Sequence, residues 1–218
     1  MKKSINLKAA EKKIISIIGL GYVGLPLLLA FEKKKIKQVI GIDSDPKKIE
    51  ILKSGKSYIS DVKLKKFKNK KVLFTENIEL VKKSDFIIIC LPTPLNKKKE
   101  PDLSIVKNSL KSITPFLRKG QTIILESTTY PGTTKELLLP IIEKSKLKVG
   151  KNIFLAFSPE RINPGSKFPI NKIPKIVGAD DIKSLNKAKL VYNLIFQKVE
   201  NSFYHLEVRA FRVTWDYD

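Results

Sequence analysis

Three glycines in the segment 19–24 have the types and spacing of a dinucleotide-binding loop. Gly19, Gly21 and Gly24 form the pattern GxGxxG, which follows the apolar run 14–18 and precedes a segment of helical periodicity that begins near Tyr22. In such a loop the first glycine permits a tight turn. The second lets the backbone approach a pyrophosphate, and the third lets the helix pack closely on the strand. The segment therefore predicts that a dinucleotide phosphate binds at the helix amino terminus.

An acidic residue ends the next apolar run, QVIGID, nineteen positions after the last glycine of the loop. The carboxylate of this residue, Asp43, can accept hydrogen bonds from ribose hydroxyls and would repel a 2′-phosphate, for which no arginine stands nearby. We therefore predict NAD as the cofactor. The alternative is that Asp43 caps the helix expected after Pro46, although Ser44 or Asp45 could serve equally well.

Cys90 is the single cysteine of the chain. A nucleophilic thiolate needs exposure and a lowered pKa, whereas Cys90 ends the apolar run FIIIC, so we predict a buried, inert thiol. One cysteine excludes an internal disulfide framework and a cysteine-rich zinc site, and we expect no metal. This cysteine usage is typical of a reducing compartment, so we expect a cytoplasmic protein.

The formal net charge of +22 raises the possibility of nucleic-acid binding. Only four of the 43 basic residues are arginine, and the lysines are spread over nearly every expected helix and loop. A solvated lysine-rich surface explains this distribution better than a nucleic-acid interface does. The apolar segment 14–31 could also be a membrane span or signal sequence. Its three glycines instead favour a buried strand that turns into a buried helix, so we expect no membrane partner.

Alternating strands and helices must position these residues. The expected strands have no polar alternation, which indicates burial on both faces of a parallel sheet. We predict an α/β fold with a doubly wound, mainly parallel Rossmann-like sheet and helices on both faces. The expected strands are 14–18, 38–43, 71–74, 86–90, 122–126 and 153–157, and the expected crossover helices after the first are 47–55, 103–117, 133–144 and 182–196.

Two loops, 91–102 and 158–174, are longer and richer in proline than a simple connection requires. Both directly follow expected strands. Because ligands of open parallel sheets lie beyond the carboxyl ends of the strands, we interpret both segments as ligand loops. The alternative is a pair of solvated linkers.

Several motifs in order make the resemblance more specific than a dinucleotide pattern alone. From about Ile14 to Val199 the sequence resembles the UDP-glucose/GDP-mannose dehydrogenase family, and within it the UDP-N-acetylhexosamine 6-dehydrogenases. The motifs are GLGYVGLP (19–26), GKSYI (55–59), CLPTPL (90–95) with EPDLS (100–104), ESTTYPGTT (126–134), FSPERINPG (157–165) and IPKIVGA (173–179).

The resemblance implies roles for particular residues. Lys48 would approach the adenosine end of NAD, and Ser127 with Thr128 would lie near the nicotinamide. Glu160 would belong to the active site beside Thr128, and Arg161 would stand beside the sugar nucleotide. A local surface ion pair is the alternative for Glu160 and Arg161. The full set expected to bind the cofactor is Gly19, Gly21, Tyr22, Val23, Gly24, Asp43, Lys48, Leu91, Pro92, Thr93, Pro94, Ser127 and Thr128.

The resemblance also implies a two-step oxidation of the C6 alcohol of a UDP-N-acetylhexosamine or UDP-hexose to the uronic acid. Its nucleophilic cysteine would lie in a sugar-nucleotide domain beyond Asp218. We therefore expect a basic extension (1–13), an NAD-binding domain (14–200) and an atypical tail (201–218), whose His205 we expect to be uninvolved. We expect this chain alone to be inactive, with a non-catalytic NAD-binding module as the alternative. The complete family member is expected to be a homodimer.

Overall fold

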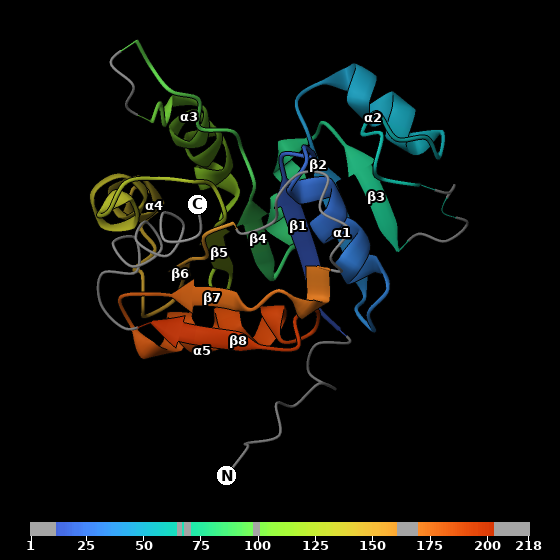
Figure 1. The fold of residues 1–218 in the computed structure, drawn as a ribbon. Helices are drawn as coiled ribbons and strands as arrows, with labels where there is room; N and C mark the ends of the chain where they lie inside the picture. Colours follow the sequence, from blue (N-terminus) through green and yellow to red (C-terminus); the bar gives the residue numbers. More distant parts are fainter. Residues whose placement is uncertain (1–11, 65–66, 68–70, 98–100, 161–169, 203–218) are drawn as a thin grey trace.

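The fold is an eight-stranded sheet with helices packed on both sides (Figure 1). The computed structural model describes residues 12–64, 67, 71–97, 101–160 and 170–202. Arg161, most of the predicted loop 158–174 and all but two residues of the predicted tail lie outside the described residues.

The strands follow the apolar runs of the sequence. They are β1 (Ile14–Ile18), β2 (Gln38–Ile42), β3 (Val72–Thr75), β4 (Phe86–Ile89), β5 (Thr122–Leu125), β6 (Phe154–Phe157), β7 (Lys175–Gly178) and β8 (Val199–Ser202). The α-helices are α1 (Gly24–Glu32), α2 (Pro46–Lys53), α3 (Ser104–Ile113), α4 (Leu139–Glu143) and α5 (Ile182–Tyr192). Short 3-10 segments span Ile78–Lys83, Thr114–Phe116 and Ile170–Lys172, and a π-helical turn spans Thr134–Leu138.

The described core forms two layers because the central strands are apolar on both faces. Ile15 and Ile17 of β1 pack in one cluster with the buried side chains of α1 and α5. Ile18 packs in the other with the buried side chains of α3 and α4. Successive side chains of a strand point to opposite faces, so the uninterrupted apolar runs supply both layers. The predicted doubly wound α/β fold is confirmed.

The strand order is β3-β2-β1-β4-β5-β6-β7-β8, so the connections after β1 run first to one side of the sheet and then to the other. At the end of β1, Ile18 is in register with Ile42 of β2 and with Ile89 of β4. This register brings the residues that follow three strands to one edge of the sheet. A crevice at such a switch point is the usual ligand site of an open parallel sheet.

Two strands were not among those predicted from the apolar runs. β7 pairs antiparallel with β6, and β8 pairs parallel with β7, so the sheet is mainly parallel as expected. The β7 run begins with Lys175, a charged residue that breaks the apolar pattern. β8 continues to Ser202, two residues past the predicted domain boundary at 200.

Two predicted helices are shorter than expected because each contains a proline. The helix predicted over 103–117 ends as α3 at Ile113, and Pro115 lies in the 3-10 turn that follows. The helix predicted over 133–144 is divided into a π-helical turn and α4, and Pro140 stands at the start of α4. Proline has no N–H to donate to the carbonyl four residues earlier, so the regular helix is interrupted. In the described part of the chain, no helix is both long and apolar enough to cross a membrane.

Candidate cofactor cleft

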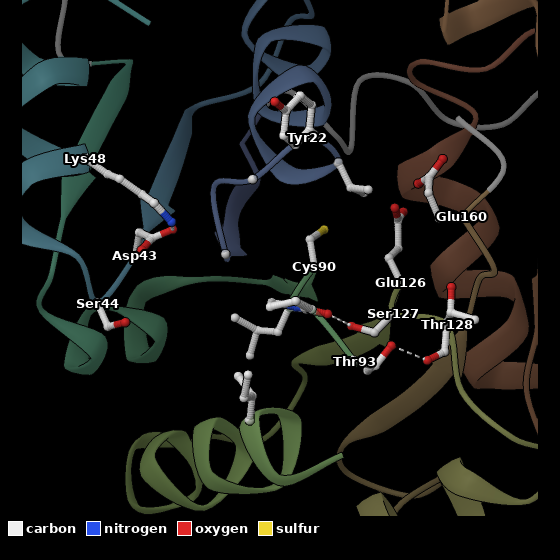
Figure 2. A pocket seen from close by; sticks show the side chains of 16 residues that line it. Tyr22, Asp43, Ser44, Lys48, Cys90, Thr93, Glu126, Ser127, Thr128 and Glu160 are labelled. Atoms are coloured by element: carbon white, nitrogen blue, oxygen red, sulfur yellow. Dashed lines mark hydrogen bonds and ion pairs between the residues drawn. The ribbon is translucent and has the colours of Figure 1, made fainter. Parts of the chain in front are cut away.

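A cleft of about 650 Å³ opens at the carboxyl ends of β1, β2, β4 and β5. In Figure 2, Asp43, Ser44 and Lys48 lie on one side of the view and Glu126, Ser127, Thr128 and Glu160 on the other, with Cys90 between them. The cleft is lined by Gly19, Gly21, Tyr22, Val23, Asp43, Ser44, Lys48, Cys90, Leu91, Pro92, Thr93, Ile105, Glu126, Ser127, Thr128 and Glu160.

The three glycines of the loop meet different steric demands. Gly19 has a φ of +89°, and a Cβ there would lie 2.6 Å from the carbonyl oxygen of Cys90. A Cβ on Gly24 would lie 1.9 Å from the carbonyl oxygen of Gly19, so α1 packs against this loop only through a glycine. A Cβ on Gly21 would meet no atom within 4 Å. The protein's own packing therefore does not require a glycine at position 21, which leaves its side-chain space to a ligand.

Asp43 anchors the glycine loop. Its Oδ2 accepts a hydrogen bond from the N–H of Leu20 at 2.9 Å, and its Oδ1 accepts one from the N–H of Asp45 at 3.1 Å. Lys48 Nζ lies 3.7 Å from Asp43 Oδ2. Asp45, not Asp43, caps α2, because its Oδ1 accepts from the N–H groups of Lys47 and Lys48. The alternative interpretation of Asp43 as the helix cap is therefore wrong.

Tyr58 supports the same end of the cleft, and the sequence analysis did not single it out. Its hydroxyl donates to the carbonyl oxygen of Leu20. Burial, with the nearby charges of Asp43 and Asp45, raises the pKa of Tyr58 well above its ordinary value, so the phenol stays protonated. Lys48 Nζ lies 5.7 Å from the centre of the Tyr58 ring. The GKSYI motif contains Tyr58, so this motif was the sequence feature that could have identified it as a site residue.

Two hydrogen bonds join the loops after β4 and β5 (Figure 2). Ser127 Oγ donates to the carbonyl oxygen of Leu91 at 2.6 Å, and Thr93 Oγ1 donates to the carbonyl oxygen of Thr128 at 2.7 Å. These bonds fix the two loops against each other at the end of the cleft opposite Asp43. Gly24 and Pro94, which were expected to bind the cofactor, do not line the cleft.

A buried charge cluster lies beside these loops. Lys175 Nζ lies 3.3 Å from Glu126 Oε2 and 3.4 Å from Glu160 Oε2, and the Lys175 side chain is only 3% exposed. The hydroxyl of Tyr192 donates to Glu126 Oε1. Burial raises the pKa of Glu126 to about 7, against the opposing effect of Lys175. Burial alone would lower the pKa of Lys175, but Glu126 and Glu160 outweigh it and raise that pKa.

Within the described residues, Glu160 forms an ion pair with Lys175 of β7 in a largely buried cluster. The alternative of a local pair between Glu160 and Arg161 stays untested, because Arg161 lies outside the described residues. Glu126, Lys175 and Tyr192 were not among the site residues predicted from the sequence. Glu126 begins the ESTTYPGTT motif and Lys175 lies within IPKIVGA, so both stood in the quoted motifs. Their contact could not be deduced from sequence because they lie on strands separated in the sheet by β6.

The prediction that Cys90 is buried is confirmed. The residue is buried at the floor of the cleft. Burial raises the pKa of its thiol well above the ordinary value, and the carboxylates of Glu126 and Glu160 raise it further. Cys90 is therefore a protonated thiol at neutral pH and a poor nucleophile.

The cleft has the chemistry that a dinucleotide requires. The open space at Gly21 admits a diphosphate next to the backbone, and the Asp43 carboxylate stands at the end of β2 where a ribose would lie. Among the described residues, no group of histidine, cysteine, aspartate and glutamate side chains could hold a metal ion.

Comparison with known proteins agrees with this geometry. Residues 13–196 match the family model described as UDP-glucose/GDP-mannose dehydrogenase family, NAD binding domain. The chain is 38% identical over 183 residues to Protein CapL of Staphylococcus aureus. This alignment covers 83% of this chain and 43% of CapL. The chain is 40% identical over 155 residues to UDP-N-acetyl-D-glucosamine 6-dehydrogenase of Pseudomonas aeruginosa, covering 70% of this chain and 36% of that enzyme.

Solved structures show the same fold. The structure of UDP-D-ManNAc dehydrogenase from Pyrococcus horikoshii superposes with a TM-score of 0.85 at 27% identity, over 93% of this chain and 50% of that chain. The UDP-N-acetyl-mannosamine dehydrogenase Cap5O from Staphylococcus aureus superposes with a TM-score of 0.81 at 29% identity, over 93% of this chain and 51% of that chain. The chain thus spans about half or less of the length of these curated relatives and solved structures.

Proposed function

The chain belongs to the UDP-glucose/GDP-mannose dehydrogenase family and comprises its NAD-binding domain, and from this premise we propose how its cleft holds the cofactor. The adenosine ribose lies at Asp43 and Lys48, and the diphosphate lies over Gly21 at the amino terminus of α1. The nicotinamide lies at the opposite end, beside Ser127 and Thr128. The observation that carries this proposal is the open space at Gly21 in the same cleft as the buried carboxylate of Asp43.

Each wall of the cleft has a distinct task in this proposal. Asp43 accepts hydrogen bonds from the ribose hydroxyls and repels a 2′-phosphate. The free N–H groups at the start of α1 donate to the diphosphate. The joined loops at Leu91 and Ser127 hold the nicotinamide end rigid, which favours a single orientation. Gly24 contributes by packing α1 on the loop and not by contact with the cofactor.

The proposed parent reaction is oxidation of the C6 alcohol of a UDP-N-acetylhexosamine to the uronic acid, with NAD as the hydride acceptor. Its support is the named activity of the relative from Pseudomonas aeruginosa. Thr128 and Glu160 line the end of the cleft where the reacting alcohol would stand, and we assign them to the catalytic site. Arg161, outside the described residues, would contact the sugar nucleotide.

The complete activity needs more than the described residues supply. The aldehyde stage requires an exposed thiolate, and Cys90 is buried and protonated. We therefore propose that this chain alone binds NAD without turnover. It is either one part of an enzyme whose remaining residues a separate polypeptide supplies, or a non-catalytic NAD-binding module. We also propose that residues 14–200 form the NAD-binding domain and that the protein is cytoplasmic. The complete family member is proposed to be a homodimer.

Calorimetric titration with NAD and NADP tests the cofactor site. We expect NAD to bind more tightly, by on the order of tenfold, since NADP would bring its 2′-phosphate against the buried carboxylate of Asp43. Asp43→Asn keeps an oxygen that can accept from the N–H of Leu20 but removes the charge, so it should bring the two affinities close together. Asp45→Asn, at the neighbouring helix cap, is the matched control and should keep the preference. Equal binding of NAD and NADP by the unmodified chain would contradict the role of Asp43.

A further inference from the structure

The cluster of Glu126, Glu160 and Lys175 contains two carboxyl groups and one ammonium group. With both carboxylates ionised, two negative charges face one ammonium, and the cluster has a net charge of −1. With one carboxylate protonated, its net charge is zero. The cluster lies at the end of the cleft opposite Asp43, where Glu126 and Glu160 both line the wall (Figure 2).

The two forms of the nicotinamide differ by the same unit of charge, because the ring is cationic in NAD⁺ and neutral in NADH. We propose that the cluster sets the redox preference of the cofactor site through one proton on Glu126. The ionised cluster favours NAD⁺ over NADH, and the neutral cluster does not. This inference rests on the proposed function, since it requires the nicotinamide at this end of the cleft.

Geometry identifies Glu126 as the residue that carries the proton. Its side chain is fully buried, whereas that of Glu160 is 11% exposed. Within the described residues, Glu126 Oε2 accepts no hydrogen bond and has the ion pair to Lys175 at 3.3 Å. A carboxylate in this setting has less compensation for its lost hydration than Asp43, which accepts two backbone N–H groups.

Lys175, Tyr192 and Cys90, which face Glu126, keep a constant charge near neutral pH. Lys175 of β7 stays protonated because the two carboxylates raise its pKa. Burial raises the pKa of Tyr192 of α5 and of Cys90 after β4, so both stay neutral. Glu160, after β6, shares the ammonium of Lys175. The pKa of Glu126, raised to about 7, places its ionisation in the accessible range.

The sign of the pH dependence follows directly. As the pH rises through about 7, Glu126 loses its proton and the cluster becomes negative, so NAD⁺ should bind more tightly relative to NADH. By linkage, bound NAD⁺ stabilises the ionised form and should release protons from the protein. Bound NADH carries no charge on the ring and should release fewer.

Calorimetric titrations of the chain with NAD⁺ and with NADH, between about pH 6 and about pH 8, test the inference. The ratio of the NADH to the NAD⁺ dissociation constant should rise by on the order of tenfold across this range, as expected for one partly screened unit charge near the ring. Repeating the NAD⁺ titration in buffers with different ionisation enthalpies counts the protons released. Glu126→Gln should bind both cofactors with a pH-independent ratio.

Two further variants test whether a change in the pH dependence of cofactor binding is specific to Glu126. Glu79→Gln, on an exposed 3-10 segment outside the cleft, is the matched control and should keep the pH dependence of the unmodified chain. Tyr192→Phe removes the hydroxyl that donates to Glu126, so the midpoint of the transition should move to higher pH. This variant keeps the buried ring and provides a test even if Glu126→Gln does not fold.

The outcomes separate this inference from the proposed function. If both cofactors bind to the unmodified chain with a pH-independent ratio, the cluster does not set the redox preference. If the ratio changes with pH and Glu126→Gln or Tyr192→Phe leaves that change unaltered, another group carries the proton and the inference is wrong. If neither cofactor binds, the proposed function itself fails.

Discussion

At the scale of single residues, the three glycines of the loop 19–24 differ in whether the fold itself requires them. Gly19 and Gly24 are required by backbone contacts of the protein itself, whereas the space beside Gly21 is open. Gly21 is also absent from the positive-φ glycines of the described chain, so a side chain there meets no backbone strain. We therefore infer that the space beside Gly21 serves a ligand and not the packing of the protein.

The variant Gly21→Val tests this inference. The added side chain would occupy the space that we assign to the diphosphate, so NAD affinity should fall on the order of a hundredfold, equivalent to two lost charge-assisted hydrogen bonds. The free energy of unfolding should change by no more than about 1 kcal/mol. Titration calorimetry and thermal denaturation followed by circular dichroism provide the two measurements. Unchanged NAD affinity in a folded Gly21→Val protein would contradict the assigned position of the diphosphate.

Residue types and spacing along one βαβ unit were enough to place Gly19, Gly21 and Asp43 in the wall of the cleft and Gly24 where α1 packs on the loop, while their contacts with the cofactor stay predictions. Lys175 could not be predicted in this way. A lysine in an apolar run is most simply interpreted as an exposed end of a strand, and its burial depends on two distant glutamates. Such a contact depends on how strands lie side by side, which a single sequence does not specify.

At the scale of elements, the packing of α1 on β1 determines where the cleft opens. The matched variant Gly24→Ala places a methyl group against the carbonyl oxygen of Gly19. Because backbone and not a flexible side chain is in the way, this variant should be destabilised and melt roughly 5 °C lower, in contrast to Gly21→Val. Equal melting temperatures for the two variants would show that the helix can shift at little cost.

The central strands and crossover helices could be predicted because long apolar runs alternate with helical periodicity. β7 and β8 could not, since the run KIVG contains only two apolar side chains and the run VENS only one. Interruptions by Pro115 and Pro140 were visible in the sequence, but the lengths of the predicted helices did not take them into account. The loops 91–102 and 158–174 were placed after strands, and the described part of each lines the cleft at Leu91 and Glu160.

At the scale of the whole molecule, the chain matches about half or less of each curated relative and solved structure described above. We expect no NADH from the 218-residue chain with UDP-glucose, UDP-N-acetylglucosamine or UDP-N-acetylgalactosamine. Cys90 is buried and protonated, and a sugar not held against the nicotinamide loses the advantage of proximity, about 7 to 11 kcal/mol.

Absorbance at the NADH wavelength, followed over hours at high protein concentration, measures this activity. Cys90→Ser is the informative companion variant. Turnover by the parent chain that disappears in Cys90→Ser would make Cys90 the nucleophile and contradict its assignment as inert. Turnover that survives the substitution would indicate alcohol oxidation that stops at the aldehyde.

The central claim is that one cleft holds NAD in one direction, and a crystal structure of the chain with NAD tests it most directly. We predict the diphosphate beside Gly21, the adenosine ribose within hydrogen-bonding distance of Asp43, and the nicotinamide beside Glu126 and Thr128. Electron density for NAD outside this cleft, or in the reverse direction with the nicotinamide at Asp43, would contradict the account.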